Sequence, residues 1–337
     1  MEEKAKIFRD TDADLSVLAN RVIAIVGYGN QGRSQALNLR DQGVKVVVGS
    51  PSDRSAAQAK EDGFGVFTIA EACKKADIVF LLVPDEVLPE VYRDQVAPHL
   101  KKRDVLVFAS GYNVFFKTIE IAAGIDVVLL APRMIGKGVR DTYLSGEGYP
   151  ALIAVERDES GSALPTLLAL SKGVGATKMG AVVSSFREET LCDLFTEHTS
   201  MVATFRIMFD ALVAAGVRPE VAILELYASG ELVEVFSAVR DSGLHAQLQL
   251  HSRTSQYGQI VVADRNLDAV RLRKSYDMTL QHIANGDFHR EWTKVQSGDK
   301  KGFREQLDSV LSSGLQEAED ALYAGLGRRS THVKNWL

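Results

Sequence analysis

The glycine motif Gly27-Tyr28-Gly29-Asn30-Gln31-Gly32 constrains the fold of this chain more than any other short stretch. It directly follows Arg21 to Val26, an apolar run typical of a strand, and a helix is predicted from Gln31 to Gln42. Between a strand and a helix, such glycines allow the backbone to approach a pyrophosphate at the helix N-terminus. The pattern therefore predicts a dinucleotide-binding turn, with a glycine turn in a flavodoxin-like sheet as the alternative.

The first half of the chain alternates between apolar runs and helical stretches. Buried strands separated by helices of about 10–15 residues are typical of βαβ units and a parallel sheet. We predict a Rossmann-like α/β domain over residues 1–183. Its strands after the first are expected at Val44 to Val48, Ile78 to Val83, Val105 to Phe108, Val127 to Leu130 and Ala151 to Val155.

The second half of the chain has a different pattern. Residues typical of strands become scarce after Ser184, and apolar residues recur with a helical period. Pro219 is suited to the first turn of a helix, and Asp264 to Ala284 and Gly302 to Ala324 are each predicted to form one amphipathic helix. We therefore predict an all-α domain over residues 184–330.

Composition narrows the possible functions. The chain has 337 residues, of which 46% are hydrophobic and 25% charged, as in an ordinary globular protein. A net charge of −5 without a basic stripe disfavours nucleic acid as a partner, and no run of 18 apolar residues predicts a membrane span. Two cysteines cannot form a disulfide framework, and the polar N-terminus does not resemble a signal peptide. We expect a cytoplasmic protein that acts on a small molecule.

The segment after the second predicted strand bears on the choice of cofactor. The strand does not end in an acidic residue that could hold a ribose 2′-hydroxyl, whereas hydroxyl groups and an arginine suit a 2′-phosphate. Asp53 would favour NADH, but we expect NADPH. The side chains expected to hold it here are Ser50, Ser52, Arg54 and Ser55.

A second loop is expected to line the cofactor crevice. Val83-Pro84-Asp85 follows another predicted strand, and loops at the carboxyl ends of parallel strands line that crevice. The alternative is that Asp85 and Glu86 only cap the next helix.

Seven separated blocks resemble ketol-acid reductoisomerases in sequence and order. They are GYGNQGRSQALNLRDQGV, LLVPDE, GYN, VRDTY, EETLCDLFTE, GVRPE and GDFHREW. The resemblance covers nearly the whole chain and fits the short class of that family. It implies a Rossmann domain followed by a knotted all-helical domain, in a homodimer or larger homo-oligomer whose subunits complete each other's active sites. A knot would be an exception to the usual rule against threaded chains.

The resemblance also implies two Mg²⁺ ions, held by an Asp and a Glu on one helix and by two Glu on another. Asp193 and Glu197 match the first pair, and Glu225 matches one member of the second. Ser229 replaces the other member. Because Mg²⁺ requires near-octahedral oxygen ligation, this loss is expected to weaken magnesium binding. Ser252 matches the substrate-binding serine of the family.

Two loops expected near the nicotinamide depart from the family pattern. Ser110-Gly111-Tyr112-Asn113 stands where the family has His-Gly-Phe-Asn, and Ala131-Pro132-Arg133-Met134-Ile135-Gly136 where it has Ala-Pro-Lys-Gly-Pro-Gly. Gly111 and Gly136 keep positions expected to contact the cofactor, and Ser110 and Arg133 are candidate catalytic residues. Met134 and Ile135 would add apolar contacts to a substrate. For Ser110, the alternative is a passive replacement that only preserves backbone shape.

These departures favour a reductase that has lost alkyl migration. Migration suits two adjacent hard cations, whereas an iminium already carries the charge that activates it toward hydride. Asp193, Glu197 and Glu225 would attract such a cation, and one of them would relay the proton. We predict an NADPH-dependent reductase of a small, fairly apolar cyclic imine, resembling the imine reductases related to this family. The alternatives are an authentic ketol-acid reductoisomerase of branched-chain amino-acid biosynthesis with an adapted magnesium site, a 2-keto acid reductase, and a catalytically idle NADPH-binding paralogue.

Two further groups, one before and one after Asp193 and Glu197, are assigned structural roles. Glu188 and Glu189 are interpreted as a helix N-terminus that the helix dipole favours. Met201, Phe205 and Met208 are interpreted as helix core in preference to pocket lining.

Overall fold

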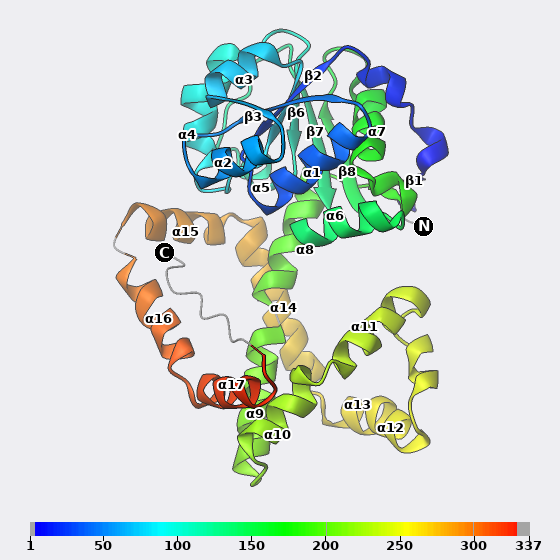
Figure 1. The fold of residues 1–337 in the computed structure, drawn as a ribbon. Coiled ribbons are helices and arrows are strands. Elements are labelled where there is room, and N and C mark those ends of the chain that lie inside the picture. Colours follow the sequence, from blue (N-terminus) through cyan, green and yellow to red (C-terminus); the bar gives the residue numbers. More distant parts are fainter. Residues whose placement is uncertain (1–3, 200, 299, 329–337) are drawn as a thin grey trace. The chain divides into compact units, whose positions relative to one another are not determined.

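The computed structural model describes residues 4–199, 201–298 and 300–328 and divides the chain into two compact units, Met1–Asp193 and Leu194–Leu337 (Figure 1). Helix α8 (Phe186–His198) crosses this division, whereas the sequence predicts a boundary near residue 183. Its first turn belongs to the first unit because Phe186 is buried and packs edge-on against Phe108, with ring centroids 5.9 Å apart. The predicted domain limits at residues 1–3 and 329–330 lie outside the described residues.

A nine-stranded sheet, ordered β1-β9-β8-β7-β6-β5-β2-β3-β4, forms the centre of the first unit (Figure 1). Its six strands from β4 to β7 are parallel, in the order of a Rossmann fold. Both faces of these strands are covered, which explains their continuous apolar sequences. The bounds are β2 Val22–Val26, β3 Lys45–Gly49, β4 Gly65–Phe67, β5 Ile78–Leu81, β6 Val105–Phe108 and β7 Asp126–Pro132.

The remaining strands correct the expectation of a purely parallel sheet. Strand β8 (Ala151–Arg157) is antiparallel to β7, β9 (Ala181–Val183) is parallel to β8, and β1 (Ile7–Phe8) is antiparallel to β9. Pro132, at the end of β7, pairs with Ala151, at the start of β8. The connection between them therefore leaves and re-enters the sheet at the same edge, so it does not make the crossover that a parallel pair requires.

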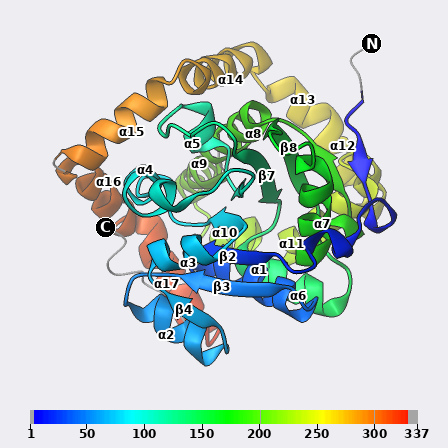
Figure 2. The same cartoon turned by 90° about the horizontal axis from the view of Figure 1, so that it is seen from above.

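Helices cover both faces of the sheet in the first unit. Helices α1 (Asn30–Asp41), α6 (Gly136–Ser145) and α7 (Ala163–Val174) contribute to one apolar core. Helices α3 (Ile69–Lys75) and α4 (Leu88–Val91) contribute to the core on the other face. Viewed from above, β2, β3 and β4 succeed one another toward the sheet edge, where α2 lies (Figure 2). Other segments of this unit are α2 Arg54–Glu61, α5 Tyr112–Phe115, the π-helical turn Tyr92–Val96 and the 3₁₀ turns Asp10–Asp12, Leu15–Leu18, Ala97–His99 and Ala176–Lys178.

Every regular element described in the second unit is helical. Its small core contains Phe209, Ile223 and Ala318, which come from α9, α10 and α17. The α-helices are α9 Met201–Ala214, α10 Pro219–Ile223, α11 Glu231–Ser242, α12 Arg253–Tyr257, α13 Ala263–Asn266, α14 Ala269–Ala284, α15 Asp287–Ser297, α16 Lys301–Leu311 and α17 Gly314–Gly325. Leu224–Ala228 and Gly258–Val262 are π-helical, and Ala246–Leu250 is 3₁₀. The predicted combination of a Rossmann-like domain and a helical domain is confirmed.

Two predicted helices of the second unit are wrong as single elements. The first is interrupted at Leu267, because Asp268 begins a new helix by accepting a hydrogen bond from the backbone N–H of Arg271. The second is interrupted at Ser312, and Ser313 caps α17 in the same way. At both breaks a side-chain cap starts the new helix.

The three apolar residues after α8 do not share one environment. Phe205 packs against the core of the second unit, and its ring lies 5.4 Å from that of Tyr227. The core assignment is wrong for Met201, which is 54% exposed, and for Met208, which is also exposed. Within the described residues, no helix is both long and apolar enough to cross a membrane.

Candidate active site

The glycine turn between β2 and α1 has a geometry that other residues would disturb. Gly27 has φ +94°, and a Cβ there would lie 2.6 Å from the carbonyl oxygen of Leu82. A Cβ on Gly32 would lie 2.0 Å from the carbonyl oxygen of Gly27. Gly29 is different, because a Cβ there would meet no atom within 4 Å. It is the N-cap of α1, so open space lies where the unpaired N–H groups of a helix can bind a pyrophosphate.

The start of α1 also holds the loop that precedes α6. Gln31 donates from Nε2 to the carbonyl oxygen of Met134 over 2.8 Å, and Ser34 donates from Oγ to that of Gly136 over 2.6 Å. A Cβ on Gly136 would lie 2.3 Å from the carbonyl oxygen of Asn30, so only glycine allows this approach. The Met134 side chain packs against the main core, and the Ile135 side chain is exposed.

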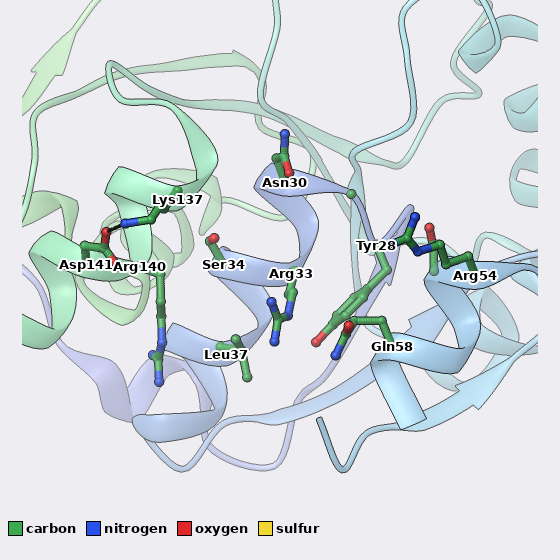
Figure 3. A pocket seen from close by; sticks show the side chains of 12 residues that line it. Tyr28, Asn30, Arg33, Ser34, Leu37, Arg54, Gln58, Lys137, Arg140 and Asp141 are labelled. Atoms are coloured by element: carbon green, nitrogen blue, oxygen red, sulfur yellow. Dashed lines mark hydrogen bonds and ion pairs between the residues drawn. The ribbon is translucent and has the colours of Figure 1, made fainter. Parts of the chain in front are cut away.

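A cleft of about 460 Å³ opens beside the glycine turn (Figure 3). Its basic side chains are mostly paired with acids: Arg33 with Asp62, Arg140 with Asp41, and Lys137 with Asp141. Arg54, at the start of α2, makes no ion pair with any described residue. We call this the nucleotide cleft; its lining residues are Tyr28, Gly29, Asn30, Arg33, Ser34, Leu37, Arg54, Ser55, Gln58, Lys137, Arg140 and Asp141.

Tyr28 and Asp62 fix one wall of the nucleotide cleft. The Tyr28 hydroxyl donates to Asp62 over 2.9 Å, and its ring packs edge-on against Phe64. Arg33 donates to both oxygens of the same carboxylate. Burial, followed by the hydrogen bond with Asp62, raises the pKa of Tyr28, so its hydroxyl remains a donor at neutral pH.

Asp53 has a local structural role. Its carboxylate accepts from the backbone N–H of Ala56 over 3.0 Å and caps α2, and the buried Ser50 hydroxyl donates to it over 3.4 Å. Ser52 is exposed beside it. Helix capping therefore explains why Asp53 is present, and no contact with a ribose is needed to explain it.

A second group of polar residues gathers after β5 and β6. Ser110, which follows β6, donates from Oγ to Asp85 Oδ2 over 3.2 Å. Asn113 donates from Nδ2 to the other carboxylate oxygen over 2.8 Å and also to the Asp85 backbone oxygen. The capping alternative is wrong for Asp85, because Val87 is the N-cap of α4 and no side chain caps that helix. Burial raises the pKa of Asp85 to about 6, although both hydrogen bonds oppose the shift.

Arg133, directly after β7, bridges two carboxylates of α8. It donates from Nη2 to Glu189 over 2.8 Å and from Nη1 to Asp193 over 3.0 Å. Glu189 is only 1% exposed, and its other oxygen accepts from the backbone N–H of Gly111 over 2.6 Å. A Cβ on Gly111 would lie 2.4 Å from the carbonyl oxygen of Phe186, so glycine is required where this loop meets α8.

Glu189 is the site residue that the sequence interpretation missed. Glu188 does accept from the hydroxyls of Ser184 and Ser185, as expected at a helix start. Glu189 lies in the first turn of α8, as predicted, and it also has a role in the site: burial raises its pKa, while Gly111 and Arg133 lower it. The available signal was its spacing, because Glu189, Asp193 and Glu197 recur every four residues on one helix.

The structure thus brings together five polar side chains of the first unit. We call Asp85, Ser110, Arg133, Glu189 and Asp193 the carboxylate cluster. The four other candidate side chains belong to the second unit and are exposed there: Glu197, Glu225, Ser229 and Ser252. Glu225 lies in a π-helical turn, and Ser252 caps α12 by accepting from the backbone N–H of Ser255.

Two of the side chains at positions expected to bind magnesium, Asp193 and Ser229, do not suit a divalent cation as the structure places them. The Asp193 carboxylate already binds the guanidinium of Arg133, and a fixed positive charge 3.0 Å from its oxygen repels a divalent cation. Ser229 offers a neutral hydroxyl, which already accepts from the backbone N–H of Glu231 over 3.3 Å. The glycine turn, the open space at Gly29 and the basic nucleotide cleft do fit a phosphorylated dinucleotide.

Two family models match successive parts of the chain. The family model "Acetohydroxy acid isomeroreductase, NADPH-binding domain" matches residues 17–180, and "Ketol-acid reductoisomerase, C-terminal domain" matches residues 186–326. A ketol-acid reductoisomerase (NADP(+)) of Caldivirga maquilingensis is 40% identical over 319 residues, which are 93% of this chain and 95% of that protein. One of Pyrobaculum calidifontis is 39% identical over 317 residues, 93% of this chain and 96% of that protein.

A solved structure is similar over the same extent. The NADH-preferring ketol-acid reductoisomerase from an uncultured archean has a TM-score of 0.88 and 32% sequence identity. The similarity covers 95% of this chain and 98% of that one.

Proposed function

The chain belongs to the ketol-acid reductoisomerase family and is an NAD(P)H-dependent oxidoreductase, and from this premise we propose that it reduces the C=N bond of a small, fairly apolar cyclic imine without alkyl migration. The contact of Arg133 with Asp193 and Glu189 carries this proposal. It places a protein cation at a carboxylate that the family resemblance assigns to magnesium.

Alkyl migration is the step that these contacts disfavour. It requires an alkoxide and a ketone polarised together, which suits two adjacent divalent cations. Arg133 neutralises one expected ligand, and Ser229 removes the charge of another. A guanidinium keeps its proton at any physiological pH, so this charge cannot be withdrawn by deprotonation.

Hydride transfer requires less of the protein. The nicotinamide cofactor supplies the hydride, and the chain must hold the cofactor, orient the electrophile and deliver a proton. The glycine turn and the first turn of α1 suit the pyrophosphate. Glu189 and Asp193 outnumber the single guanidinium of Arg133, and this excess of negative charge favours a cationic iminium over an anionic keto acid.

We propose NADPH as the preferred cofactor. Arg54 supports this choice, because it lines the nucleotide cleft without an acidic partner among the described residues. A guanidinium binds phosphate through two parallel hydrogen bonds. The acid of the neighbouring turn, Asp53, is engaged in capping α2.

The relatives favour a second candidate function. The named enzymes that are 39–40% identical over 93% of this chain are ketol-acid reductoisomerases, and their names support authentic isomeroreduction more directly than imine reduction. In that case Arg133 would have to leave Asp193 when magnesium and substrate bind. The two candidates therefore differ in whether a divalent cation is needed.

Purified protein tests both candidates in one set of assays. NADPH oxidation would be followed with 2-methyl-1-pyrroline in EDTA, and with 2-acetolactate in Mg²⁺. We expect turnover of the imine that EDTA leaves intact. Turnover of acetolactate that requires Mg²⁺, without imine reduction, would establish the second candidate. NADPH binding without oxidation by either compound, or by a 2-keto acid, would indicate an idle paralogue.

We also propose that the protein acts as a homodimer or larger homo-oligomer. The second unit leaves many large apolar side chains exposed, including Val202, Ile207 and Val270, the last of which is 83% exposed. Apolar surface of this extent usually marks a protein interface. Light scattering coupled to size-exclusion chromatography should give at least twice the mass of one chain, and a monomer at micromolar concentration would contradict the proposal.

A further inference from the structure

Asp85 and Ser110 form a hydrogen-bonded couple that the resemblance does not explain. Ser110 donates to Asp85 over 3.2 Å, and its oxygen accepts from the backbone N–H of Tyr112 over 3.3 Å. Asn113 holds the other Asp85 oxygen at 2.8 Å. The couple thus joins the loop after β5 to the loop after β6. Both loops lie at the carboxyl ends of parallel strands, where ligands bind in Rossmann folds.

We infer that Asp85 holds the proton consumed in the reduction and passes it to the substrate through the hydroxyl of Ser110. This inference rests on the proposed reductase function. Ser110 would be the catalytic residue, because it would give its proton to the substrate directly, and Asp85 a positioning and proton-storing residue that acts through it.

The proton transfer balances as follows. Protonated Asp85 donates to Ser110 Oγ, and Ser110 gives its own hydroxyl proton to the imine nitrogen. The reduced nicotinamide, when bound, would supply the hydride to the C=N carbon and be oxidised, so that the imine becomes an amine. Asp85 is left as a carboxylate and regains a proton from water before the next turnover.

The surroundings of Asp85 suit a group that gains and loses a proton near neutral pH. Burial, Glu86 on the same loop and Asp193 on α8 all raise its pKa, and the hydrogen bonds from Ser110 and Asn113 limit the rise to about 6. Tyr112 on α5 stays neutral, because burial and Asp85 raise its pKa to about 12. A stored proton with a pKa near the working pH is the condition for efficient general acid catalysis.

A purely structural role would also explain the three hydrogen bonds, so the test must separate the two roles. A neutral imine, 2-methyl-1-pyrroline, needs both hydride and proton. Its N-methylated iminium, 1,2-dimethyl-1-pyrrolinium, needs the hydride alone. Damage to the loops would lower the rates with both compounds, whereas loss of the proton source affects only the neutral imine.

We expect Asp85→Asn to lower kcat/KM for the neutral imine about 100-fold more than for the iminium, which is the scale of general acid catalysis. Ser110→Ala should act in the same way, and Ser110→Thr should restore most of the difference because it keeps a hydroxyl. Glu90→Gln, which removes an exposed charge from α4 that does not affect the pKa of Asp85, should keep the wild-type ratio. Equal losses with both compounds in Asp85→Asn would overturn the inference.

The pH profile provides a second criterion. The advantage of wild type over Asp85→Asn with the neutral imine should be constant below pH 6 and should fall about tenfold per pH unit above it, as Asp85 loses its proton. The ratio of the two enzymes cancels the titration of the imine itself. A ratio independent of pH from 5 to 8 would contradict proton storage on Asp85.

Failure of the proposed function can be distinguished from failure of this inference. A holoenzyme that reduces neither compound contradicts the reductase proposal. The couple would then be tested by carbon-13 NMR titration of the aspartate carboxyl groups with NADPH bound. Asp85 should titrate near pH 6, and Ser110→Ala should raise its midpoint by removing a hydrogen bond to the carboxylate. A midpoint near the ordinary value of about 3.9 would overturn the inference.

Discussion

The nucleotide cleft and the carboxylate cluster lie in the same unit but are held by different forces. In the cleft, backbone contacts at Gly27 and Gly32 fix the turn, and the ion pairs around it are partly exposed. Exposed pairs of this kind contribute about 0–1 kcal/mol each. In the cluster, Glu189 is buried, and its two oxygens bind Arg133 and Gly111. The cleft therefore depends on steric fit, whereas the cluster depends on pairing of the buried Glu189 carboxylate.

The largest expected effect is the loss of stability when the carboxylate cluster is broken. Glu189→Ala leaves the Gly111 N–H without its acceptor and the Arg133 guanidinium with Asp193 alone, and hydrogen bonds to a charged group contribute about 1.5–3 kcal/mol each. For a unit of this size we expect the melting temperature to fall by about 6–20 °C. Glu188→Ala, on the exposed side of the same turn, should change the free energy of unfolding by no more than about 0.5 kcal/mol. Similar melting temperatures for the two variants would show that the cluster does not depend on charge pairing.

In the nucleotide cleft, the largest expected effect of a substitution is on cofactor affinity. Arg54→Gln removes the cleft cation that lacks an acidic partner among the described residues, and a hydrogen bond to a charged group contributes about 1.5–3 kcal/mol. The Kd for NADPH should therefore rise about 10–100-fold, while that for NADH stays nearly constant. Lys60→Gln removes the same charge from α2 outside the cleft and is the matched control. A parallel loss of both cofactors would mean that Arg54 binds something other than the 2′-phosphate.

The same contrast explains how much of the structure the sequence predicts. The strands β2, β5 and β6 are predicted because a strand covered on both faces is a continuous apolar run. The glycine turn is predicted because its steric requirements lie within six consecutive residues. The three-residue strands β4 and β9 are too short to show a pattern, and the direction of β8 depends on where its connection re-enters the sheet.

Burial of a charged residue is harder to predict than a turn. Glu189 and Glu188 look alike in sequence, and what separates them is Arg133, which is 56 positions away from Glu189. Asp85 could equally have capped the next helix, but in the structure Val87 is the N-cap and Asp85 binds Ser110 and Asn113 instead. The sequence can therefore propose which residues carry charge, but the pairing between distant loops decides what those charges do.

A smaller effect on cofactor binding tests the steric fit at the glycine turn. Gly29→Ala adds a methyl group where the protein has no atom within 4 Å, so the melting temperature of the cofactor-free protein should not change. The methyl group would occupy space expected for the pyrophosphate, and we expect NADPH and NADH to bind about tenfold more weakly, a loss of about 1.4 kcal/mol. Gly302→Ala adds a methyl group to equally open space on α16 and should leave binding intact. Normal binding by Gly29→Ala would show that the pyrophosphate lies elsewhere.

The smallest expected effect concerns the acid at the edge of the cleft. Asp53 accepts from the Ala56 N–H, and losing an N-cap typically costs about 1 kcal/mol, so Asp53→Ala should lower the melting temperature by about 2–4 °C. Asp53→Ser keeps a capping oxygen but removes the charge, and it should restore most of that loss. If Asp53 only caps α2, both variants keep the wild-type ratio of NADPH to NADH affinity. A shift of both variants toward NADPH would instead show that this carboxylate also repels the 2′-phosphate, and cofactor choice would then depend on the balance between Asp53 and Arg54.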